Sequence, residues 1–434
     1  MGEKKQDLWE SWNGNLKHTF KNRYSIDSED QLSKIVKESK KVRFYGNKQS
    51  SSDIAAGTDT LIDMKTYNKI INVDSQNKRI TIQSGAPLEL LIDTAEENKW
   101  CIPCLPDINT ITIGGAISTG THGTNGKLLS EYIYSCRLLK ANGEIITLNK
   151  GDELFEAAKV SLGTLGIITE ITFQCEDIFY LHLKEGPEKD SRWLKNIKNE
   201  LAEFDFLRIL WLPHTGHGYA IKGKKVSADF SIKPKLGPKF LKHRRTASKV
   251  LYKNTHKAPW FTAIANKILY FGFFRSKKEH FGSLYQATVT KSRGSTLELA
   301  EWTVDLDKFP LVFKELKKTI NSWKNDAFIH IPMDVRFVKK DNSWLSYAHK
   351  KDIVTMGCVC RNANAANEYE AFKTVEEIFI KHGGRPHWGK RFSAKDKELS
   401  RLYPKWEDFK KTRNELDPTD KFLNPYLTSL FNGQ

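Results

Sequence analysis

The sequence predicts an α+β fold with two domains and a C-terminal segment that returns to the first of them. Three observations predict this fold. Short β-type runs alternate with short helical patterns over residues 1–178, whereas longer β-type runs, basic loops and longer helices fill residues 179–395. Residues 396–434 contain a turn-rich stretch. A chain of 434 residues is also too long for one small core, so two domains are expected.

Local patterns predict the elements of the first domain in order, as two small α+β lobes that meet at a seam. Residues 42–45 are a β run that leads into a polar loop over residues 46–53. Two alternating runs separated by a polar turn indicate a hairpin over residues 69–83, and residues 88–98 have the apolar spacing of a helix. Further strands are predicted over 136–140, 145–148 and 167–173, and a further helix over 152–162. In the second domain, the clearest predicted helix covers residues 364–382.

Composition and charge restrict the class of protein. Apolar residues make up 39% and charged residues 28%, which is the balance of a soluble globular chain. The net charge of +17 favours an anionic partner: a nucleic acid, an anionic membrane or a phosphate-bearing cofactor. The first residues are too polar for a secretory signal, and no run of 18 apolar residues occurs. Because the chain has only six cysteines, we expect a reducing, cytoplasmic location.

No metal site is predicted. Cys101 and Cys104 form a CxxC motif, but no second pair stands at the spacing of a zinc site. We therefore expect these two cysteines to pack in the interior as ordinary apolar residues.

A basic segment over residues 222–257 precedes an apolar stretch over residues 259–274. The basic segment carries twelve Lys or Arg residues and a single acid, Asp229. One interpretation is a solvated loop followed by a core helix. The other is an amphipathic surface over residues 222–274 that rests on anionic lipid as a peripheral membrane contact. The segment has no recognised motif for reading bases, so we expect no nucleic-acid partner.

Two loops have the composition of a site for a flat, anionic ligand. Residues 113–124 read Ile-Gly-Gly-Ala-Ile-Ser-Thr-Gly-Thr-His-Gly-Thr, and this density of glycine and small hydroxyl residues lets a ligand approach the backbone closely. The segment is neither GxGxxG nor a P-loop, so it implies neither a Rossmann site nor a kinase-type site. The loop over residues 46–53 offers further backbone amides, with Lys48 and three serines suited to a pyrophosphate.

The two loops together resemble the FAD domain of the vanillyl-alcohol oxidase superfamily, and in particular that of its aldonolactone oxidoreductases and alditol oxidases. The resemblance spans nearly the whole chain and is weakest over residues 180–325. A His-Trp-x-Lys motif combined with the His-Gly loop is a specific combination. The further segments that carry the resemblance are 163–169 beside the adenine, 334–337 for a Glu-x-Arg active-site strand, 387–390 for His-Trp-x-Lys, 12–15 and 422–427.

The resemblance implies FAD as the cofactor, held in a two-lobed FAD-binding domain below an α+β substrate cap domain. Many relatives attach the flavin covalently through a histidine in the first loop. This chain has Gln49 at that position, so we expect a non-covalent, dissociable FAD. The residues implied to bind the cofactor are Gly46, Asn47, Lys48, Gln49, Ser50, Ser51, Pro106, Asp107, Thr112, Gly115, Thr119, Gly120, Thr121, His122, Ile168 and Lys390.

The resemblance also implies a catalytic group of Asp334, Arg336, Lys390 and His387. Flavin N5 accepts a hydride from a carbinol carbon, and the protein orients that C–H bond and stabilises the negative charge on the reduced ring. Arg336 suits a substrate hydroxyl or an oxyanion, and Lys390 suits the pyrimidine edge of the flavin. Asp334 stands where the family has the longer glutamate, and it shares a strand face with Arg336. His387 shapes the strand that presents Lys390.

The implied function is FAD-dependent oxidation of a sugar-1,4-lactone of the D-arabinono- or L-gulono-lactone type at its 2-hydroxyl, with oxygen reduced to hydrogen peroxide. Pro106 resembles the oxidase side of the family, and Asp107 can touch substrate hydroxyls or form a turn. Gly357 stands where alditol oxidases carry a histidine, which favours a lactone. Three alternatives stay open: an alditol (xylitol or sorbitol) oxidase, a lactone dehydrogenase with a membrane electron acceptor, and an inactive basic protein that binds membrane or nucleic acid.

Overall fold

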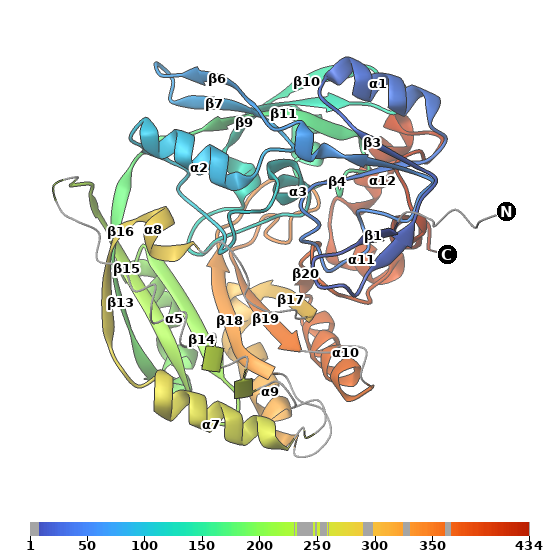
Figure 1. Ribbon diagram of the computed structural model, residues 1–434. Coiled ribbons are helices and arrows are strands. Elements are labelled where there is room, and N and C mark those ends of the chain that lie inside the picture. The colour runs from blue at the N-terminus through green and yellow to red at the C-terminus, as the bar shows by residue number, and fades with distance from the viewer. Residues whose placement is uncertain are drawn as a thin grey trace.

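The computed structural model has two parts that face each other, with the N-terminal strands in one part and one large sheet in the other (Figure 1). It describes residues 8–229, 231, 246–247, 250–251, 258, 260–289, 298–323, 330–360 and 366–433. Both parts combine helices with strands, which confirms the predicted α+β class. Within these ranges, no helix is both long enough and apolar enough to cross a membrane.

The first lobe is a small parallel sheet near the N-terminus. Its elements are β1 (Leu8–Glu10), β2 (Lys17–Thr19), β3 (Asn22–Ser25), α1 (Glu29–Glu38), β4 (Val42–Tyr45), β5 (Thr60–Asp63) and a 3-10 helix, Met64–Thr66. Strand β5 pairs in parallel with both β3 and β4, and the chain passes from β3 to β4 through α1. The side chain of Ser28 caps α1 by accepting a hydrogen bond from the N–H of Gln31.

The second lobe is a five-stranded antiparallel sheet. Its elements are β6 (Ile70–Asp74), β7 (Arg79–Gln83), α2 (Leu88–Glu97), α3 (Ile113–Ser118), a 3-10 helix (Leu129–Tyr132), β9 (Ile133–Leu139), β10 (Ile145–Asn149), α4 (Glu153–Ala158) and β11 (Ile167–Gln174). The strand order is β10-β9-β11-β7-β6. Alternate residues of β11, Ile167, Ile171 and Phe173 among them, are fully buried.

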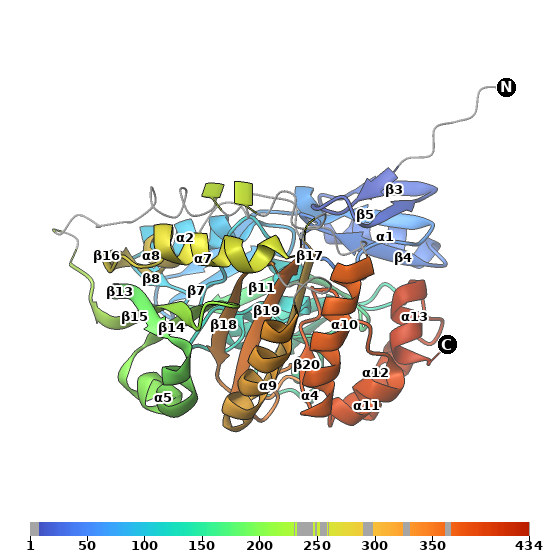
Figure 2. The same cartoon turned by 90° about the horizontal axis from the view of Figure 1, so that it is seen from below.

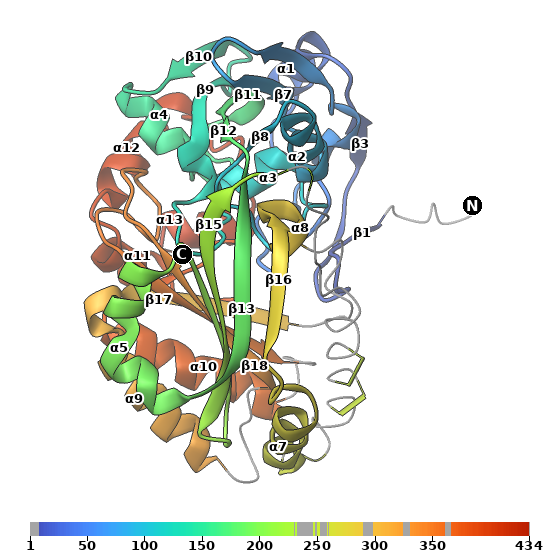
Figure 3. The ribbon, with the colours of Figure 1, turned by 90° about the vertical axis from the view of Figure 1, so that its left-hand side faces the viewer.

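An eight-stranded sheet forms the centre of the second part. Its strands are β13 (Phe179–Lys189), β14 (Phe206–Leu212), β15 (His217–Ser227), β16 (Lys278–Ser283), β17 (Glu298–Asp305), β18 (His330–Val338), β19 (Ile353–Cys360) and β20 (Arg385–Pro386). The order across the sheet is β16-β13-β15-β14-β18-β19-β17-β20. The long strands β13 and β15 run side by side, and the shorter β16 lies on the other side of β13 (Figure 3).

The two faces of the large sheet have opposite character. Helices α5 (Asp190–Glu203), α9 (Phe309–Ser322) and α10 (Ala366–Lys381) lie along one face (Figure 2). On β18, Met333, Val335 and Phe337 are buried in the core on this side. Because side chains alternate along a strand, Asp334 and Arg336 point the other way, toward the first part. The sheet therefore presents its charged residues to the seam.

The stretch that follows the Gly-rich segment joins the two parts. The hydroxyl of Thr124 donates to the carbonyl of Leu207 on β14. The N–H of Asn125 donates to the carbonyl of Phe337 at 2.7 Å, and the N–H of Lys339 donates to the carbonyl of Gly126 at 2.9 Å. These bonds tie residues 124–126 to β14 and to the end of β18.

The C-terminal residues contact both parts. Their helices are α11 (Asp396–Leu402), α12 (Trp406–Leu416) and α13 (Pro425–Phe431). The apolar side chains of these helices, such as Trp406 and Phe431, belong to the core cluster of the large sheet. Between α12 and α13, the carbonyl of Lys421 accepts from the N–H of Val42 at 2.9 Å, and the amide of Asn424 donates to the carbonyl of Asp53 at 2.8 Å.

Most predicted elements are present, and two local predictions need correction. The predicted helix over residues 152–162 is shorter and ends at Ala158. It cannot reach Leu162, because Leu162 and Gly163 have φ angles of 57° and 64°, which lie outside a right-handed helix. The Gly-rich segment is not loop throughout, since its first residues form α3. The paired cysteines of the CxxC motif are buried free thiols, and burial raises the pKa of Cys101 to about 12 and that of Cys104 to about 11.

The basic segment predicted over residues 222–257 is described only in part. Residues 230, 232–245, 248–249 and 252–257 lie outside the described residues. The apolar stretch that follows forms α7 (Phe261–Phe273), whose Leu269 and Tyr270 pack with Leu212 and Tyr219 in a separate small cluster. The remaining short elements are β8 (Trp100–Cys101), β12 (Glu176–Asp177), α8 (Leu284–Thr288) and a 3-10 helix, Leu306–Lys308.

Candidate active site

A cavity of about 390 Å³ lies at the seam between the first part and the large sheet. Its walls come from β4 and the loop after it, from α3 and the segment after it, and from β17, β18 and β19. Every residue that the sequence singled out for catalysis or cofactor binding lines this cavity except Ser51 and Gly120. Both exceptions are chain neighbours of lining residues. The structure thus brings the predicted residues together at one place.

The loop after β4 presents unsatisfied backbone donors to the cavity. The N–H groups of residues 47–50 have no hydrogen-bond partner in the part of the chain that the structure describes. Gly46 lies directly against Thr112, because a Cβ added there would be 1.9 Å from Thr112 Oγ1. The ammonium of Lys48 lies over the ring of Tyr45, 5.3 Å from its centroid. The loop therefore lies directly against the Thr112 side chain at the start of α3.

The same loop is bonded to the segment that carries Lys390. The N–H of Ser51 donates to the carbonyl of Gly389 at 2.9 Å, and the Ser50 hydroxyl donates to the same oxygen at 3.3 Å. On its other side, the amide of Asn47 donates to the carbonyl of Thr110. These bonds fix the loop between α3 and the 387–390 segment.

A buried arginine lies behind this end of the cavity. Arg43, on β4, is only 2% exposed, and its guanidinium donates to the carbonyls of Leu162, Gly163 and Phe422 at 2.7–2.9 Å. Its Nε has no hydrogen-bond partner among the described residues. Burial lowers the pKa of Arg43 to about 9. The contacts place a cation at this end with carbonyl oxygens rather than a carboxylate around it.

The segment after α3 follows the cavity wall toward the large sheet. The hydroxyl of Thr119 donates to the carbonyl of Gly115 at 2.9 Å. Gly120 has a φ of 69°, which favours glycine, and its carbonyl accepts from the buried Tyr347 hydroxyl. The carbonyl of Thr121 accepts from the N–H of Leu129 at 2.8 Å. The turn at Gly120 therefore directs the chain into the position where His122 meets the large sheet.

Four charged side chains form a closed network at the large-sheet end. Arg208, on β14, donates to both oxygens of Asp334 at 2.9 and 2.8 Å and to both oxygens of Asp107 at 3.0 and 2.8 Å. Arg336 donates to Asp334 at 2.9 and 2.6 Å and to Asp107 at 2.6 Å. We call Asp107, Arg208, Asp334 and Arg336 the charge quartet. With two guanidiniums and two carboxylates, it is electroneutral.

The quartet keeps Asp107 and Arg336 ionised. Burial works to raise the pKa of Asp107, but Arg208 and then Arg336 outweigh it and hold that pKa at about 2. Burial would lower the pKa of Arg336, yet Asp107 and Asp334 raise it above its ordinary value. At neutral pH, Asp107 is therefore a hydrogen-bond acceptor and a very weak base.

A histidine–glutamate pair crosses the seam beside the quartet. His122 Nδ1 lies 2.8 Å from the carbonyl of Gly123, and His122 Nε2 lies 2.9 Å from Glu301 Oε1 on β17. Because a carbonyl only accepts, Nδ1 carries a proton, and a second proton is shared between Nε2 and the carboxylate. Burial works to raise the pKa of Glu301, but His122, and then His387 and Lys390, bring it well below its ordinary value. The pair is thus a buried ion pair.

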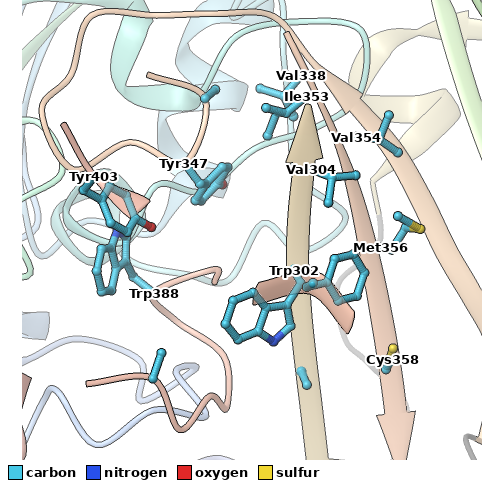
Figure 4. Close-up of a cluster of buried hydrophobic side chains, with 14 of the residues drawn as sticks. Trp302, Val304, Val338, Tyr347, Ile353, Val354, Met356, Cys358, Trp388 and Tyr403 are labelled. Carbon is cyan, nitrogen blue, oxygen red and sulfur yellow. The ribbon is translucent and has the colours of Figure 1, made fainter. Parts of the chain in front are cut away.

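The 387–390 segment is held from both sides. The backbone N–H of His387 donates to the carbonyl of Glu301 at 2.9 Å, and the N–H of Arg391 donates to the carbonyl of Leu299 at 2.8 Å. Trp388 is fully buried, with its indole N–H bonded to the carbonyl of Leu345 at 2.7 Å. Its ring stacks on Tyr403, on the side of β17 and β19 where Trp302, Val304, Val354 and Met356 pack (Figure 4). This anchor leaves His387 and Lys390 in the cavity wall.

Three side chains in the cavity wall are of types that can bind a metal, but their hydrogen bonds occupy the nitrogens that a metal would need. Ligand atoms of His122, Glu301 and His387 lie within 4.8 Å of one another. Nε2 of His122 is already engaged by Glu301, and Nδ1 of His387 accepts the N–H of Gly389 at 3.1 Å, which places the His387 proton on Nε2. A metal needs an imidazole lone pair, so this arrangement fits an ion pair better than a metal site.

Sequence reasoning missed three charged residues of the site: Arg43, Arg208 and Glu301. Arg43 and Arg208 are each the lone charge of an otherwise apolar strand, as in Phe-Leu-Arg-Ile-Leu-Trp-Leu of β14, and Glu301 lies between apolar residues of β17, in Leu-Ala-Glu-Trp. A charge is costly to bury unless it is paired, so such a position signals a buried partner. The partners come from distant parts of the chain, which local patterns do not reveal.

Two family models match the chain. The model described as D-arabinono-1,4-lactone oxidase matches residues 171–430, and the model described as FAD binding domain matches residues 24–149. This chain belongs to the D-arabinono-1,4-lactone oxidase family. The family that the sequence motifs resemble is therefore confirmed.

Relatives and solved structures agree with this assignment. L-gulonolactone oxidase of Bos taurus is 28% identical over 406 residues, which cover 91% of this chain and 90% of that protein. L-gulono-1,4-lactone dehydrogenase of Mycobacterium tuberculosis is 27% identical over 430 residues, which cover 96% and 98%. A cholesterol oxidase from Brevibacterium sterolicum has the same fold, with a TM-score of 0.80 at 14% identity over 98% of this chain and 97% of that one.

The cavity residues fit FAD, the cofactor of this family member. The unpartnered amides of residues 47–50 are donors suited to a pyrophosphate, and Arg43 adds a cation without a carboxylate partner among the described residues. Gly46 lets this loop lie directly against the Thr112 side chain, which also lines the cavity. Lys390, Asp107, Asp334 and Arg336 line the same cavity with charged groups of the kind that suit a redox ring and a polar substrate.

Proposed function

We propose that this protein oxidises the 2-hydroxyl carbon of a sugar-1,4-lactone. The carbinol carbon loses a hydride and its hydroxyl loses a proton. Both are transferred to dioxygen, so that one lactone and one dioxygen give one 2-keto-lactone and one hydrogen peroxide. The observation that carries the proposal is the convergence of Asp334, Arg336, His387 and Lys390 in the lining of one cavity that also has the donors for FAD. The family assignment supports the same chemistry.

The residues have distinct roles in this proposal. FAD, when bound, supplies the hydride acceptor, and its ring system gains negative charge as the hydride arrives. Lys390 stabilises that charge, because its ammonium lies in the wall at this end. Arg336 lines the cavity with Nη1 free of hydrogen bonds to any described residue, and it binds the substrate oxygen. Asp334 and Asp107 hold the guanidinium in place.

Space beside Asp334 favours a lactone over an alditol. Gly357 pairs with Asp334 across β18 and β19 and lines the cavity. A Cβ there would lie 3.8 Å from the Asp334 carbonyl oxygen, so the glycine leaves open the position where alditol oxidases carry a histidine. A five-membered lactone ring is wider than an extended polyol and needs that room.

Two finer properties belong to the proposal. Pro106 lines the cavity without a polar group, which supports oxygen rather than a protein or quinone as the electron acceptor. Gln49 also lines the cavity. A glutamine side chain does not form the covalent bond to a flavin that a histidine can form, which supports a dissociable FAD. Acid precipitation of the purified holoprotein tests this second point. We expect the yellow colour in the supernatant, whereas colour in the pellet contradicts a non-covalent cofactor.

Anaerobic reduction tests the reaction itself. The FAD-loaded protein is mixed with D-arabinono-1,4-lactone, L-gulono-1,4-lactone, xylitol or sorbitol, and bleaching of the visible flavin band is recorded. We expect bleaching by a lactone, no bleaching by the alditols, and stoichiometric hydrogen peroxide when air is admitted. Bleaching by alditols alone identifies an alditol oxidase. Reoxidation by a quinone but not by oxygen identifies a dehydrogenase, and absence of flavin binding supports the inactive basic protein.

Helix α7 supports a peripheral contact with anionic lipid. Its exposed edge carries Trp260, Ile264, Ile268 and Phe271, which are 55%, 43%, 44% and 63% exposed. Lys267 is exposed on the same helix, and no acid occurs over residues 260–278. Apolar side chains beside cations suit the boundary of an anionic membrane. The location proposed from this surface is cytoplasmic and peripheral on a membrane.

Vesicle flotation tests the lipid contact. We expect the protein to float with vesicles of phosphatidylserine and phosphatidylcholine but not with phosphatidylcholine alone. The double variant Ile268→Asp, Phe271→Asp should lose most of this binding, by about tenfold or more, because each exposed apolar side chain and each charge contributes roughly 1 kcal/mol. Leu311→Asp is the control, since Leu311 is 57% exposed on α9 instead. Equal flotation of both variants contradicts the proposal.

A further inference from the structure

Arg208 occupies an unusual position in the large sheet. It lies on β14 between the buried residues Leu207 and Ile209. Ile209 pairs with Val335 of β18, and one further step in the same register puts Arg208 opposite Arg336 on one face of the sheet. Like charges directly opposite each other repel. The two arginines are therefore neighbours only because Asp107 and Asp334 lie between them.

The two arginines differ in how many of their guanidinium nitrogens are used in hydrogen bonds to Asp107 and Asp334. Arg208 does not line the cavity, and it uses Nε, Nη1 and Nη2 on the four oxygens of Asp107 and Asp334. Arg336 lines the cavity and uses only Nε and Nη2 on the same acids. Arg208 thus lies behind the acids and satisfies them, whereas Arg336 keeps one nitrogen toward the substrate space.

The charge balance has a consequence for substrate choice. An arginine that faces a cavity with a net positive charge is a receptor for carboxylates. In the charge quartet, both positive charges are compensated, so Arg336 offers a hydrogen-bond donor without an excess charge. A sugar-1,4-lactone is neutral, while the open-chain acid formed by its hydrolysis has the same carbon skeleton and one negative charge.

We propose that Arg208 and Asp107 set the specificity of the site for the neutral lactone against its hydrolysed, open-chain acid. This inference rests on the proposed lactone oxidation. Arg208 acts as a positioning residue: it keeps Asp107 and Asp334 in place around Arg336 and balances the second carboxylate. Asp107 prevents Arg336 from becoming an anion site. Removing one member of either sign should shift the preference in opposite directions.

Binding measurements on FAD-loaded variants test the proposal. In anaerobic rapid mixing, the dissociation constant of D-arabinono-1,4-lactone is read from the dependence of the flavin reduction rate on lactone concentration. The dissociation constant of D-arabinonate is read from its competitive inhibition of that reduction. The compared proteins are the natural chain, Asp107→Asn, Arg208→Gln and Arg208→Lys. Arg137→Gln is the control, because Arg137 forms a two-point ion pair with Glu29 outside the cavity. Its loss lowers the net charge of the protein by one unit, as Arg208→Gln does.

The expected result is a change in the ratio of the acid's dissociation constant to the lactone's. In Asp107→Asn, the quartet gains a net positive charge and the ratio should fall by about tenfold or more. In Arg208→Gln, the quartet gains a net negative charge and the ratio should rise by a similar factor. Arg208→Lys keeps the charge but loses the fork of donors, so the ratio should stay while kcat/KM falls about tenfold. Arg137→Gln should change neither quantity.

Two outcomes overturn the inference. If Asp107→Asn and Arg208→Gln shift the ratio in the same direction, or leave it within twofold of the natural chain, the quartet stabilises the fold but does not set the preference for the lactone over the acid. If Arg208→Gln does not fold, the Asp107→Asn and Arg208→Lys results still decide. Failure of the proposed function is distinct, because the natural chain itself would then bind no lactone and its flavin would not bleach.

Discussion

The two ends of the cavity recognise their ligands by different means. Toward the first part, the chain uses backbone amides of residues 47–50, a glycine pressed against Thr112 and the single buried cation of Arg43. Toward the large sheet, it uses charged side chains from five separate segments, closed into the quartet and the His122–Glu301 pair. The first end depends on the space around the backbone, and the second depends on charge balance. Substitutions should therefore act on cofactor affinity at one end and on chemistry at the other.

The largest effect is expected from Arg336→Lys. Lysine keeps the charge but cannot bond Asp107 and Asp334 while it also holds a substrate oxygen. We expect kcat/KM for the lactone to fall by about 100- to 1,000-fold, as is typical for loss of one donor to developing charge. The FAD content should not change, because Arg336 lies at the other end. If Arg336→Lys lost FAD to the same extent as it lost activity, the two ends of the cavity would not act separately on cofactor affinity and chemistry.

The next effect concerns the cofactor end. In Gly46→Ala, the new methyl group would overlap Thr112, where the Cβ position is 1.9 Å from Oγ1. Such an overlap costs the folded protein about 2 kcal/mol unless the loop shifts away from Thr112. Because a shifted loop no longer holds its amides in place for FAD, we expect a higher FAD dissociation constant, about 30-fold higher if the whole cost falls on the bound state. Isothermal titration of the apoprotein with FAD measures it. Gly272→Ala is the control, since a Cβ at Gly272 meets no atom within 4 Å. At saturating FAD, we expect kcat of Gly46→Ala to stay within about twofold of the natural chain.

A smaller effect is expected at Glu301, with a matched comparison on the same strand. Glu301→Gln removes the charge that holds the second proton on His122, so the free energy of unfolding at pH 7 should fall by about 2 kcal/mol. Glu298, three residues earlier, is also buried but is bonded to Asn13 and Asn15 instead. Burial raises the pKa of Glu298 and outweighs the bond from Asn15, so Glu298→Gln should preserve or increase stability at pH 7. Chemical denaturation of both variants provides the measurement.

The two glutamates should also have opposite dependence on pH. The folded-state pKa of Glu301 is depressed, so its stabilisation is present above the unfolded pKa of about 4.3 and is lost as pH falls toward the folded value. The folded-state pKa of Glu298 is raised, so its contribution is present below about pH 4.3 and is lost as pH rises through the folded value. Unfolding curves from pH 3 to pH 8 should show Glu301→Gln with the shallower acid decline. Parallel curves for both variants would contradict the ion pair.

The two ends also differ in how far the sequence predicted them. The loop over residues 46–50 and the segment 113–122 are contiguous, and their glycine and hydroxyl content marks them locally. Asp334 and Arg336 were found because two residues of one strand share a face. Arg208 was not, because its partner Asp107 is 101 residues away in the chain and meets it only in the folded protein. Helix α3 within the Gly-rich segment was missed for a related reason, since its glycines oppose helix in isolation and packing against Ser84 and Ala86 provides the support.

The bonds of residues 124–126 to β14 and β18 have a dynamic consequence. A cap that opens and closes over a substrate needs a hinge with few contacts across it. Here, backbone hydrogen bonds at Asn125 and Gly126 join the first part to the large sheet, beside the Asp107–Arg208 and His122–Glu301 pairs. We therefore expect the two parts to move as one body. Substrate enters and product leaves through a fixed opening, and amide hydrogen exchange at Asn125 should be as slow as in the central strands, with or without ligand.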